Sequence, residues 1–202
     1  TRGKAGVGNN IRKKNCKFTY KVKIIGTAMD VIVLNVVHEN AYIYTKYDPD
    51  TVWPPACFAI SEDGEEMGPH EDSPNKQNGS CEGCEWNEYG SADTGRGKAC
   101  GNKRRLAVLE YHDDIDLEEA EIAFVKLAPT SIKNWKSYVK KIEKTLNRPV
   151  FGVVTRLFFE EDAEFDIIDA ELVEAITDPA QFAIIVDKRN EAHEQLKIGR
   201  AH

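Results

Sequence analysis

The sequence predicts a mainly β protein with minor α content, an antiparallel barrel carrying one or two helices. Two observations lead to this fold class. Several short runs have the residue composition and alternation of strands, and one segment, 130–146, repeats apolar residues at the three- and four-residue spacing of a helix. The length of 202 residues is that of one domain. We expect no signal peptide and no membrane partner, because the apolar runs are far shorter than the ~20 residues of a spanning helix.

The elements follow from the pattern in chain order. Strands are expected at residues 18–25, 30–37, 41–47, 104–111, 121–127, 150–160 and 164–168. The breaks at 26–28 and 38–40 are short enough for hairpins. Thr130 or Ser131 is expected to cap the helix, and the apolar run 182–186 leads into a polar C-terminal helix. Short strands with one helix between them are typical of an OB-fold-like barrel.

The chain divides into three parts by composition. Residues 1–17 predict a flexible basic arm, 18–186 the OB-fold-like domain, and 187–202 a C-terminal helix or tail. Residues 61–103 are poor in aliphatic side chains and show neither a helical nor a strand period. A structureless segment of this length is unusual inside a compact domain. We therefore expect an insertion over 57–103 that something other than a hydrophobic core holds in place.

The charge of the chain is unevenly distributed. The net charge is −7, but residues 1–29 hold eight basic residues and no acid, and residues 96–105 hold five more. Residues 110–121 carry seven acids and residues 160–178 carry nine, both without a base. A basic patch on an acidic protein can still bind phosphate, so the net charge does not exclude a nucleic-acid partner.

Four of the five cysteines, Cys57, Cys81, Cys84 and Cys100, lie in or beside the insertion. Cys81 and Cys84 form a C-x2-C pair, which places two thiolates about one turn apart as in structural zinc ribbons. A closed zinc site would also supply folding free energy that the polar insertion cannot gain from burial. The sequence thus predicts a structural Zn²⁺ in a zinc-ribbon-like insertion. His70 is the alternative fourth ligand in place of Cys57.

Other interpretations of the cysteines stay open at this point. Disulfides need an oxidising compartment, and the odd count and missing secretory signal disfavour them. A redox pair needs a C-x2-C motif that opens a helix after a strand, whereas Cys81 follows a polar loop. Unconnected buried thiols are the third alternative. Cys16, in the basic arm, is expected to be a free thiol.

Glycines, aromatic residues and basic residues alternate between Cys84 and Cys100 and just beyond. Single-stranded nucleic acids are bound by such combinations, through base stacking and phosphate neutralisation. The predicted nucleic-acid contacts are Tyr42, Tyr44, Lys46, Trp53, Trp86, Tyr89, Arg96, Lys98, Lys103, Arg104 and Arg105. The alternative is that Trp86 and Tyr89 pack against the zinc site and that Tyr42 and Tyr44 belong to ordinary barrel packing.

Catalytic motifs are incomplete. The stretch 95–98 lacks the Ser or Thr and the helix of a phosphate loop. His38 and Glu39 lack the second histidine of a zinc protease motif, and the aspartates within 113–116 are typical of an acidic loop more than of a magnesium nuclease. We expect no enzymatic activity.

Several motifs resemble a known family when taken in order. They are Tyr47-Asp48-Pro49, Pro54-Pro55-Ala56-Cys57-Phe58-Ala59, Gly68-Pro69-His70, Cys81-Glu82-Gly83-Cys84, Asn87-Glu88-Tyr89-Gly90-Ser91 and Gly95-Arg96-Gly97-Lys98-Ala99-Cys100. Together they resemble a family of bacteriophage proteins regarded as single-stranded-DNA-binding proteins, most densely over residues 30–111. The resemblance implies an OB-fold barrel interrupted by a zinc-stabilised insertion, acting in phage DNA replication or recombination.

The predicted function is binding of single-stranded DNA without strong sequence preference, in the host-cell cytoplasm. Phage replication or recombination proteins are the expected further partners. An alternative is a phage structural or assembly protein whose zinc knuckle contacts other proteins. A magnesium-dependent nuclease is a third hypothesis.

Overall fold

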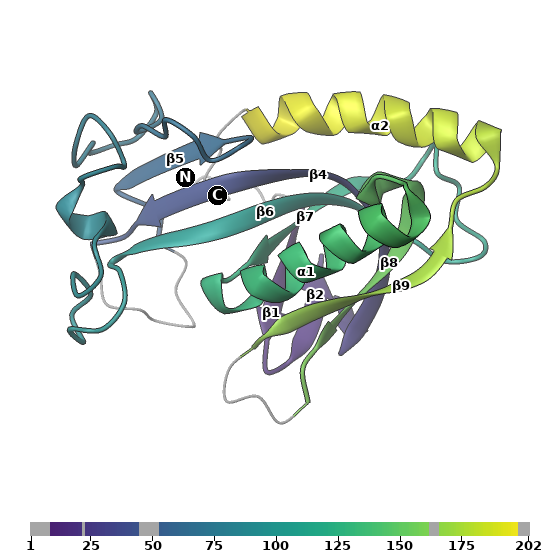
Figure 1. Cartoon of the computed structure of the whole chain (residues 1–202), viewed down its shortest axis with the longest axis horizontal. Coiled ribbons are helices and arrows are strands. Elements are labelled where there is room, and N and C mark those ends of the chain that lie inside the picture. The colour runs from purple at the N-terminus through teal and green to yellow at the C-terminus, as the bar shows by residue number, and fades with distance from the viewer. Residues whose placement is uncertain (1–8, 22, 45–52, 162–165, 198–202) are drawn as a thin grey trace, which may run out of the picture.

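The computed structural model describes residues 9–21, 23–44, 53–161 and 166–197, and it is mainly β with one curled sheet and two helices (Figure 1). The elements are β1 (Asn10–Lys14), β2 (Lys17–Tyr20), β3 (Lys23–Gly26), β4 (Ala28–Tyr42), β5 (Cys57–Ser61), the 3-10 turn η1 (Glu85–Asn87), β6 (Cys100–Glu110), β7 (Ile122–Leu127), α1 (Pro129–Leu146), the 3-10 turn η2 (Val150–Gly152), β8 (Val153–Phe159), β9 (Ile168–Ala175) and α2 (Pro179–Lys197). Neither helix has the length and hydropathy of a membrane span within these described ranges.

The strands pair in the order β3-β2-β1-β7-β6-β4-β8-β9, and β5 adds to the far end of β4. Most pairs are antiparallel, as expected, but β1 pairs with β7 in parallel, with Asn10 opposite Phe124 and Ile11 opposite Val125. The sheet is therefore mixed, and the expectation of a purely antiparallel barrel is wrong here. No hairpin joins β1 to β7, so no tight turn dictates their relative direction.

β4 is the central strand of the sheet. The break expected at 38–40 does not occur, and β4 runs unbroken over 28–42. β6 pairs along one side of it, while β8 and then β5 pair along the other. The register with β6 shifts between Val33 and Asn35, which leaves Leu34 without a partner in β6. Such a bulge bends and twists a strand, so one long strand can serve both ends of a curled sheet.

The two faces of the sheet carry separate cores, because successive side chains of a strand point to opposite faces. We call the face that α1 covers the inner face and the face that α2 covers the outer face. The inner core includes Val31, Val33, Leu106, Val108, Val125, Trp135, Tyr138 and Ile142. The outer core includes Ile32, Leu34, Val37, Ala107, Leu109, Phe124, Ile185 and Leu196. Figure 1 shows α2 lying along the sheet above β4, with the cysteine-bearing loops beyond the ends of β4 and β6.

The bulge in β4 also holds α2 in place. The Nε of Arg189 donates a hydrogen bond to the carbonyl oxygen of Leu34 over 2.9 Å. The guanidinium carbon of Arg189 lies 4.0 Å from the ring centroid of Phe151. The bulge frees a backbone acceptor that a buried position cannot leave unpaired without cost, and the helix supplies the donor.

The N-terminal arm is shorter than expected. Residues 10–14 form β1, because Ile11 is buried in the inner core and its strand pairs with β2 and β7. Residues 15–16 of the expected arm form a turn, and Lys17 begins β2. Residues 1–8 of the expected arm lie outside the described residues. At the other end, the expected boundary at 186 falls inside α2, which already begins at Pro179.

α1 begins earlier than its expected cap. Pro129 is its first residue and Ala128 is the residue that caps it, without a side-chain hydrogen bond. Ser131 lies fully buried inside the helix, and its Oγ accepts a 2.9 Å hydrogen bond from the backbone N–H of Ile168. Ser131, which resembled a cap in the sequence, therefore ties α1 to β9. β9 begins at Ile168, where the strand expected over 164–168 was to end, and continues to Ala175.

We expect Arg189→Ala to lower the free energy of unfolding by about 1–3 kcal/mol, because it leaves the buried Leu34 carbonyl without its donor. Urea denaturation of the purified chain measures this change. Asn190→Ala, an exposed neighbour on the same helix, is the control and should unfold as the wild type does. Equal unfolding midpoints for the two variants would show that the bulge needs no donor from α2.

Candidate metal centre

Two of the four insertion cysteines are placed by the central strand. Cys57 is the first residue of β5 and Cys100 is the first residue of β6. Both are registered opposite Tyr42, the last residue of β4, on its two sides. Residues that are paired in register point to the same face of a sheet. The two thiols therefore flank the end of β4 on its inner face.

The other two cysteines come from the C-x2-C turn. Gly83, between them, has φ +71, a left-handed conformation that favours glycine. The backbone N–H of Cys81 donates to the carbonyl of Met67 over 2.8 Å, and the carbonyl of Cys84 accepts from the N–H of Asn87 over 2.8 Å. These bonds tie the turn to the loop at Met67 and to the 3-10 turn η1 that follows it.

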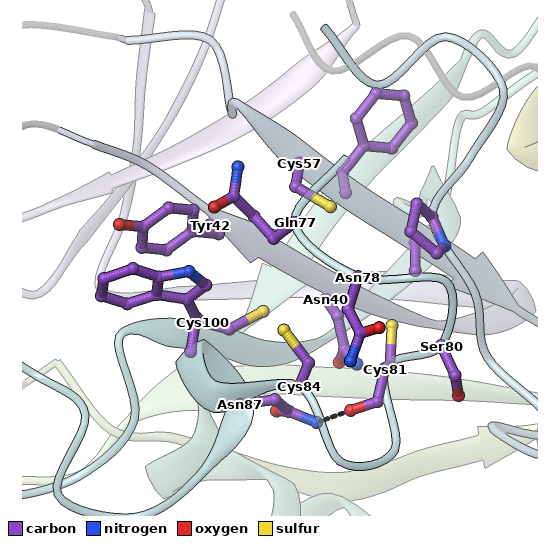
Figure 2. Close-up of a pocket in the computed structure, with 14 residues that line it drawn as sticks. Asn40, Tyr42, Cys57, Gln77, Asn78, Ser80, Cys81, Cys84, Asn87 and Cys100 are labelled. Atoms are coloured by element: carbon purple, nitrogen blue, oxygen red, sulfur yellow. Dashed lines mark hydrogen bonds between the residues drawn. The ribbon is translucent and has the colours of Figure 1, made fainter. Parts of the chain in front are cut away.

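The four sulfur atoms lie around one pocket (Figure 2). The pocket has about 330 Å³ of space, part of it open to solvent, and Asn40, Tyr42 and Trp86 also line it. Three segments that are far apart in sequence thus meet at one point. None of the five cysteines is joined in a disulfide.

Burial and mutual repulsion disfavour thiolates in this pocket. Burial, together with the smaller effect of the neighbouring Cys81, Cys84 and Cys57, raises the pKa of Cys100 to about 12. Burial likewise raises the pKa of Cys81, against a hydrogen bond from Asn40 that lowers it. Without a cation the raised pKa keeps the thiols of Cys81 and Cys100 protonated at neutral pH, and a bound cation is what would stabilise the thiolate form.

The donor set fits a soft or borderline ion, since four sulfur ligands are the commonest structural zinc set. The described residues nevertheless contain no group of three or more His, Cys, Asp or Glu side chains already arranged to hold one ion. The backbone segments are brought together, but the sulfurs are not at ligand spacing.

His70, the alternative fourth ligand, points away from the pocket. Its ring stacks on Phe58 with centroids 5.0 Å apart, and its Nδ1 accepts a hydrogen bond from the backbone N–H of Asp72. Phe58 follows Cys57 in β5, so the two side chains point to opposite faces. The imidazole is therefore on the outer face and does not line the cysteine pocket. Cys57 is the fourth candidate ligand by position.

Three asparagines link the sheet to the C-x2-C turn, and only one of them, Asn87, belongs to a motif that the sequence offered. The Nδ2 of Asn102 donates to Asn40 Oδ1 over 2.8 Å and to Asn87 Oδ1 over 2.9 Å. The Nδ2 of Asn87 donates to the Cys81 carbonyl over 2.8 Å, the dashed line in Figure 2. Asn40 and Asn102 are registered partners in β4 and β6. The only sequence signal was the Asn87-containing motif, whose partners are far away in the chain.

Two of the predicted base-stacking rings pack against each other. Tyr42 is 8% exposed and stacks on Trp86, with ring centroids 4.8 Å apart and an interplanar angle of 21°. Trp86 and the strand cover the Tyr42 ring, so the predicted contact of Tyr42 with DNA stays a prediction that would need this stack to open. Both rings line the cysteine pocket.

The other predicted rings are exposed. Tyr44 is 59%, Trp53 48% and Tyr89 83% exposed, and the Nζ of Lys98 lies 5.1 Å from the Tyr89 ring centroid. The Tyr44 hydroxyl accepts a hydrogen bond from Gln77 Nε2 over 3.0 Å. Lys46 lies outside the described residues.

The predicted basic contacts do not form one patch. Arg96 is exposed in the loop. In β6, Lys103 and Arg105 point to the outer face and Arg104 to the inner face, because side chains of a strand alternate. Burial lowers the pKa of His38, and the charge of Arg104, its registered partner, lowers it further. Arg105 is only 6% exposed, and its predicted contact with phosphate stays a prediction.

We expect Asn87→Ala to lower the free energy of unfolding by about 1–3 kcal/mol, because it leaves the Cys81 carbonyl and Asn102 short of partners. Cleavage within 81–99 by a protease should become faster for the same reason. Urea denaturation and limited proteolysis measure the two effects. Glu88→Ala, an exposed neighbour, is the control, and indistinguishable behaviour of the two variants would contradict an anchoring role.

Comparison of the chain with protein-family models, with curated proteins and with solved structures finds no match. The candidate site therefore rests on its own geometry. Four cysteine side chains from three segments surround one pocket, and exposed aromatic rings lie beside them. The hydrogen-bonded asparagines Asn40, Asn87 and Asn102, which we call the asparagine chain, tie these segments to the sheet.

Proposed function

We propose that the chain binds single-stranded DNA, without strong sequence preference and without a chemical step, through exposed rings and basic side chains at the cysteine-bearing insertion. A structural zinc ion held by Cys57, Cys81, Cys84 and Cys100 would fix that insertion. The resemblance noted in the sequence adds a role in phage DNA replication or recombination, in the host-cell cytoplasm with the phage proteins of that process.

The observation that carries the proposal is the distribution of exposed aromatic rings. Tyr44, Trp53 and Tyr89 are exposed, and every other aromatic ring in the described ranges is buried or half-buried. All three lie in or beside the insertion. Exposed rings next to basic side chains are what sequence-tolerant binding of single strands uses, because every base offers a flat face to stack on. Lys98 above the Tyr89 ring supplies such a pair.

The topology supports an OB-fold-like interpretation of the sheet. A long bulged strand, β4, pairs with β6 and β8, β7 follows β6, and α1 connects β7 to β8 under the inner core. If β4, β6 and β7 correspond to the first three barrel strands, the insertion is the loop between the first two. OB folds bind oligonucleotides on the face of the second and third strands and on that loop.

Zinc would provide the folding free energy that the insertion lacks. Among the described residues of 61–99 only Ser73 and Cys84 are buried, so burial contributes little there. An ion coordinated by thiolates of β5, β6 and the C-x2-C turn would link the three segments directly. It would stabilise them in place of a hydrophobic core. The asparagine chain supports the same segments before the ion binds.

An assembly role is the competing function, and the exposed Leu172 and Val173 on β9 favour it. Exposed apolar side chains mark a protein contact where they belong to a contiguous patch. The DNA titration below separates the two functions.

The chain purified without chelator should contain about one zinc ion. Cys57→Ser and Cys81→Ser, which remove ligands from different segments, should each lower the zinc content strongly. Cys16→Ser is the matched control, because that thiol lies at Asp166 and does not line the pocket. His70→Ala should also retain zinc. Elemental analysis measures the content, and a wild type without zinc would refute the metal centre.

Oligo-dT should quench the tryptophan fluorescence at low salt, and the dissociation constant should rise steeply with salt as counterions are released. Tyr89→Ala should weaken binding about fivefold or more, because a stacked base contributes about 1–3 kcal/mol. Val173→Ala, an exposed apolar residue away from the insertion, is the control. Equal affinity for duplex DNA would contradict the proposal, and an absence of quenching would favour the assembly function.

A further inference from the structure

A cluster of charged side chains lies on the outer face of the sheet, on the other side of β6 from the cysteines. Glu39 of β4 is registered opposite Lys103 of β6, and Arg105 of β6 is registered opposite Lys126 of β7. Side chains that are registered in this way are neighbours on one face. We call Lys103, Arg105, Lys126 and Glu39 the outer basic cluster.

The outer basic cluster has more cations than anions. Its one carboxylate, Glu39, is 5% exposed, and its Oε1 lies 2.6 Å from Lys126 Nζ. Within the described part of the chain, the side-chain nitrogens of Lys103 and Arg105 have neither a hydrogen bond nor an ion pair. Burial lowers the pKa of Lys103, and the charge of Lys126 lowers it further. Three cations against one carboxylate leave a charge that the protein does not neutralise.

Arg105 is the least satisfied member. It is 6% exposed, and its Nε is completely buried without any hydrogen-bond partner. Buried polar side-chain atoms almost always have partners, and a buried charge without one is costly. An unpartnered guanidinium nitrogen beside two lysines therefore indicates a missing acceptor.

The cluster is also preorganised. The guanidinium carbon of Arg105 lies 4.4 Å from the ring centroid of Phe124, so the ring holds the planar fork in one orientation. Gly101 leaves room for Lys103, since a Cβ there would lie 3.3 Å from Lys103 Cε. Lys126 is 39% exposed, which opens the cluster to solvent on the β7 side.

We propose that the outer basic cluster is a phosphate-binding site, with the Arg105 fork as its centre and Lys103 and Lys126 on either side. The proposal rests on the proposed function, in which the ligand is a backbone phosphate of single-stranded DNA. The planar guanidinium of an arginine donates hydrogen bonds to two phosphate oxygens at once, which the ammonium group of a lysine does not do in this fixed geometry. Glu39 holds Lys126 while the site is empty and competes with the incoming anion. Free inorganic phosphate has the same chemistry and is the other source to distinguish.

The first experiment measures oligo-dT affinity against salt. Lys126→Gln should weaken binding about fivefold and reduce the slope of log affinity against log salt by about 0.7, the value for one phosphate on a single strand. Arg105→Lys should also weaken binding, because it keeps the charge but loses the fork. Glu39→Gln should tighten binding several-fold, since it removes the competitor. Lys133→Gln, an exposed lysine of α1, is the charge-matched control and should bind as the wild type does.

A second arm uses inorganic phosphate alone. Thermal unfolding in phosphate and in chloride of equal ionic strength should show a higher melting temperature in phosphate for the wild type. This difference should disappear in Lys126→Gln and persist in Lys133→Gln.

The outcomes separate the two proposals. Oligonucleotide binding that Lys126→Gln, Arg105→Lys and Glu39→Gln all leave unchanged overturns the phosphate site and leaves the proposed function standing. If the wild type binds no oligonucleotide, the proposed function fails, and the phosphate arm decides the site. A phosphate-dependent shift lost in Lys126→Gln then supports a site for free phosphate, and no shift overturns it.

Discussion

The pairing of β4 with β6 is the constraint on which the rest of the structure depends. It runs over almost the whole length of both strands and contains the bulge that curves the sheet. The same bulge frees the Leu34 carbonyl that anchors α2 through Arg189. At the far end of the pairing, Tyr42 has Cys57 on one side and Cys100 on the other. The sheet's curvature, the outer helix and the cysteine pocket are thus consequences of one pair of strands.

β6 also connects the candidate metal centre to the outer basic cluster. Its inner-face residues include Cys100 and Asn102, which belong to the metal centre, and its outer-face residues include Lys103 and Arg105. A strand transmits position to both faces, because its side chains share one backbone. An ion that fixes the start of β6 would therefore also fix the cations on its other face.

Much of the local structure was predictable. The patterns at 104–111, 121–127 and 130–146 predicted β6, β7 and α1 within a few residues, since the two strands are apolar runs buried on both faces and the helix buries one face at helical spacing. The break expected at 38–40 was wrong because His38, Glu39 and Asn40 are polar and resembled a turn. Glu39 and Asn40 are buried with polar partners, Lys126 and Asn102, from distant strands. No local pattern reveals such partners.

The sequence by itself determined the kinds of residues available: a C-x2-C pair with two further cysteines, a basic stretch at 96–105, and strands of period two. Only the tertiary structure decided how these residues are distributed. It put His70 on the opposite face from Cys57, stacked Tyr42 on Trp86, and divided the basic stretch between two faces of β6. The physical reason is that composition and period act over neighbouring residues. The partner of each strand, and therefore the surroundings of each face, is set by burial and hydrogen bonding between segments far apart in the chain.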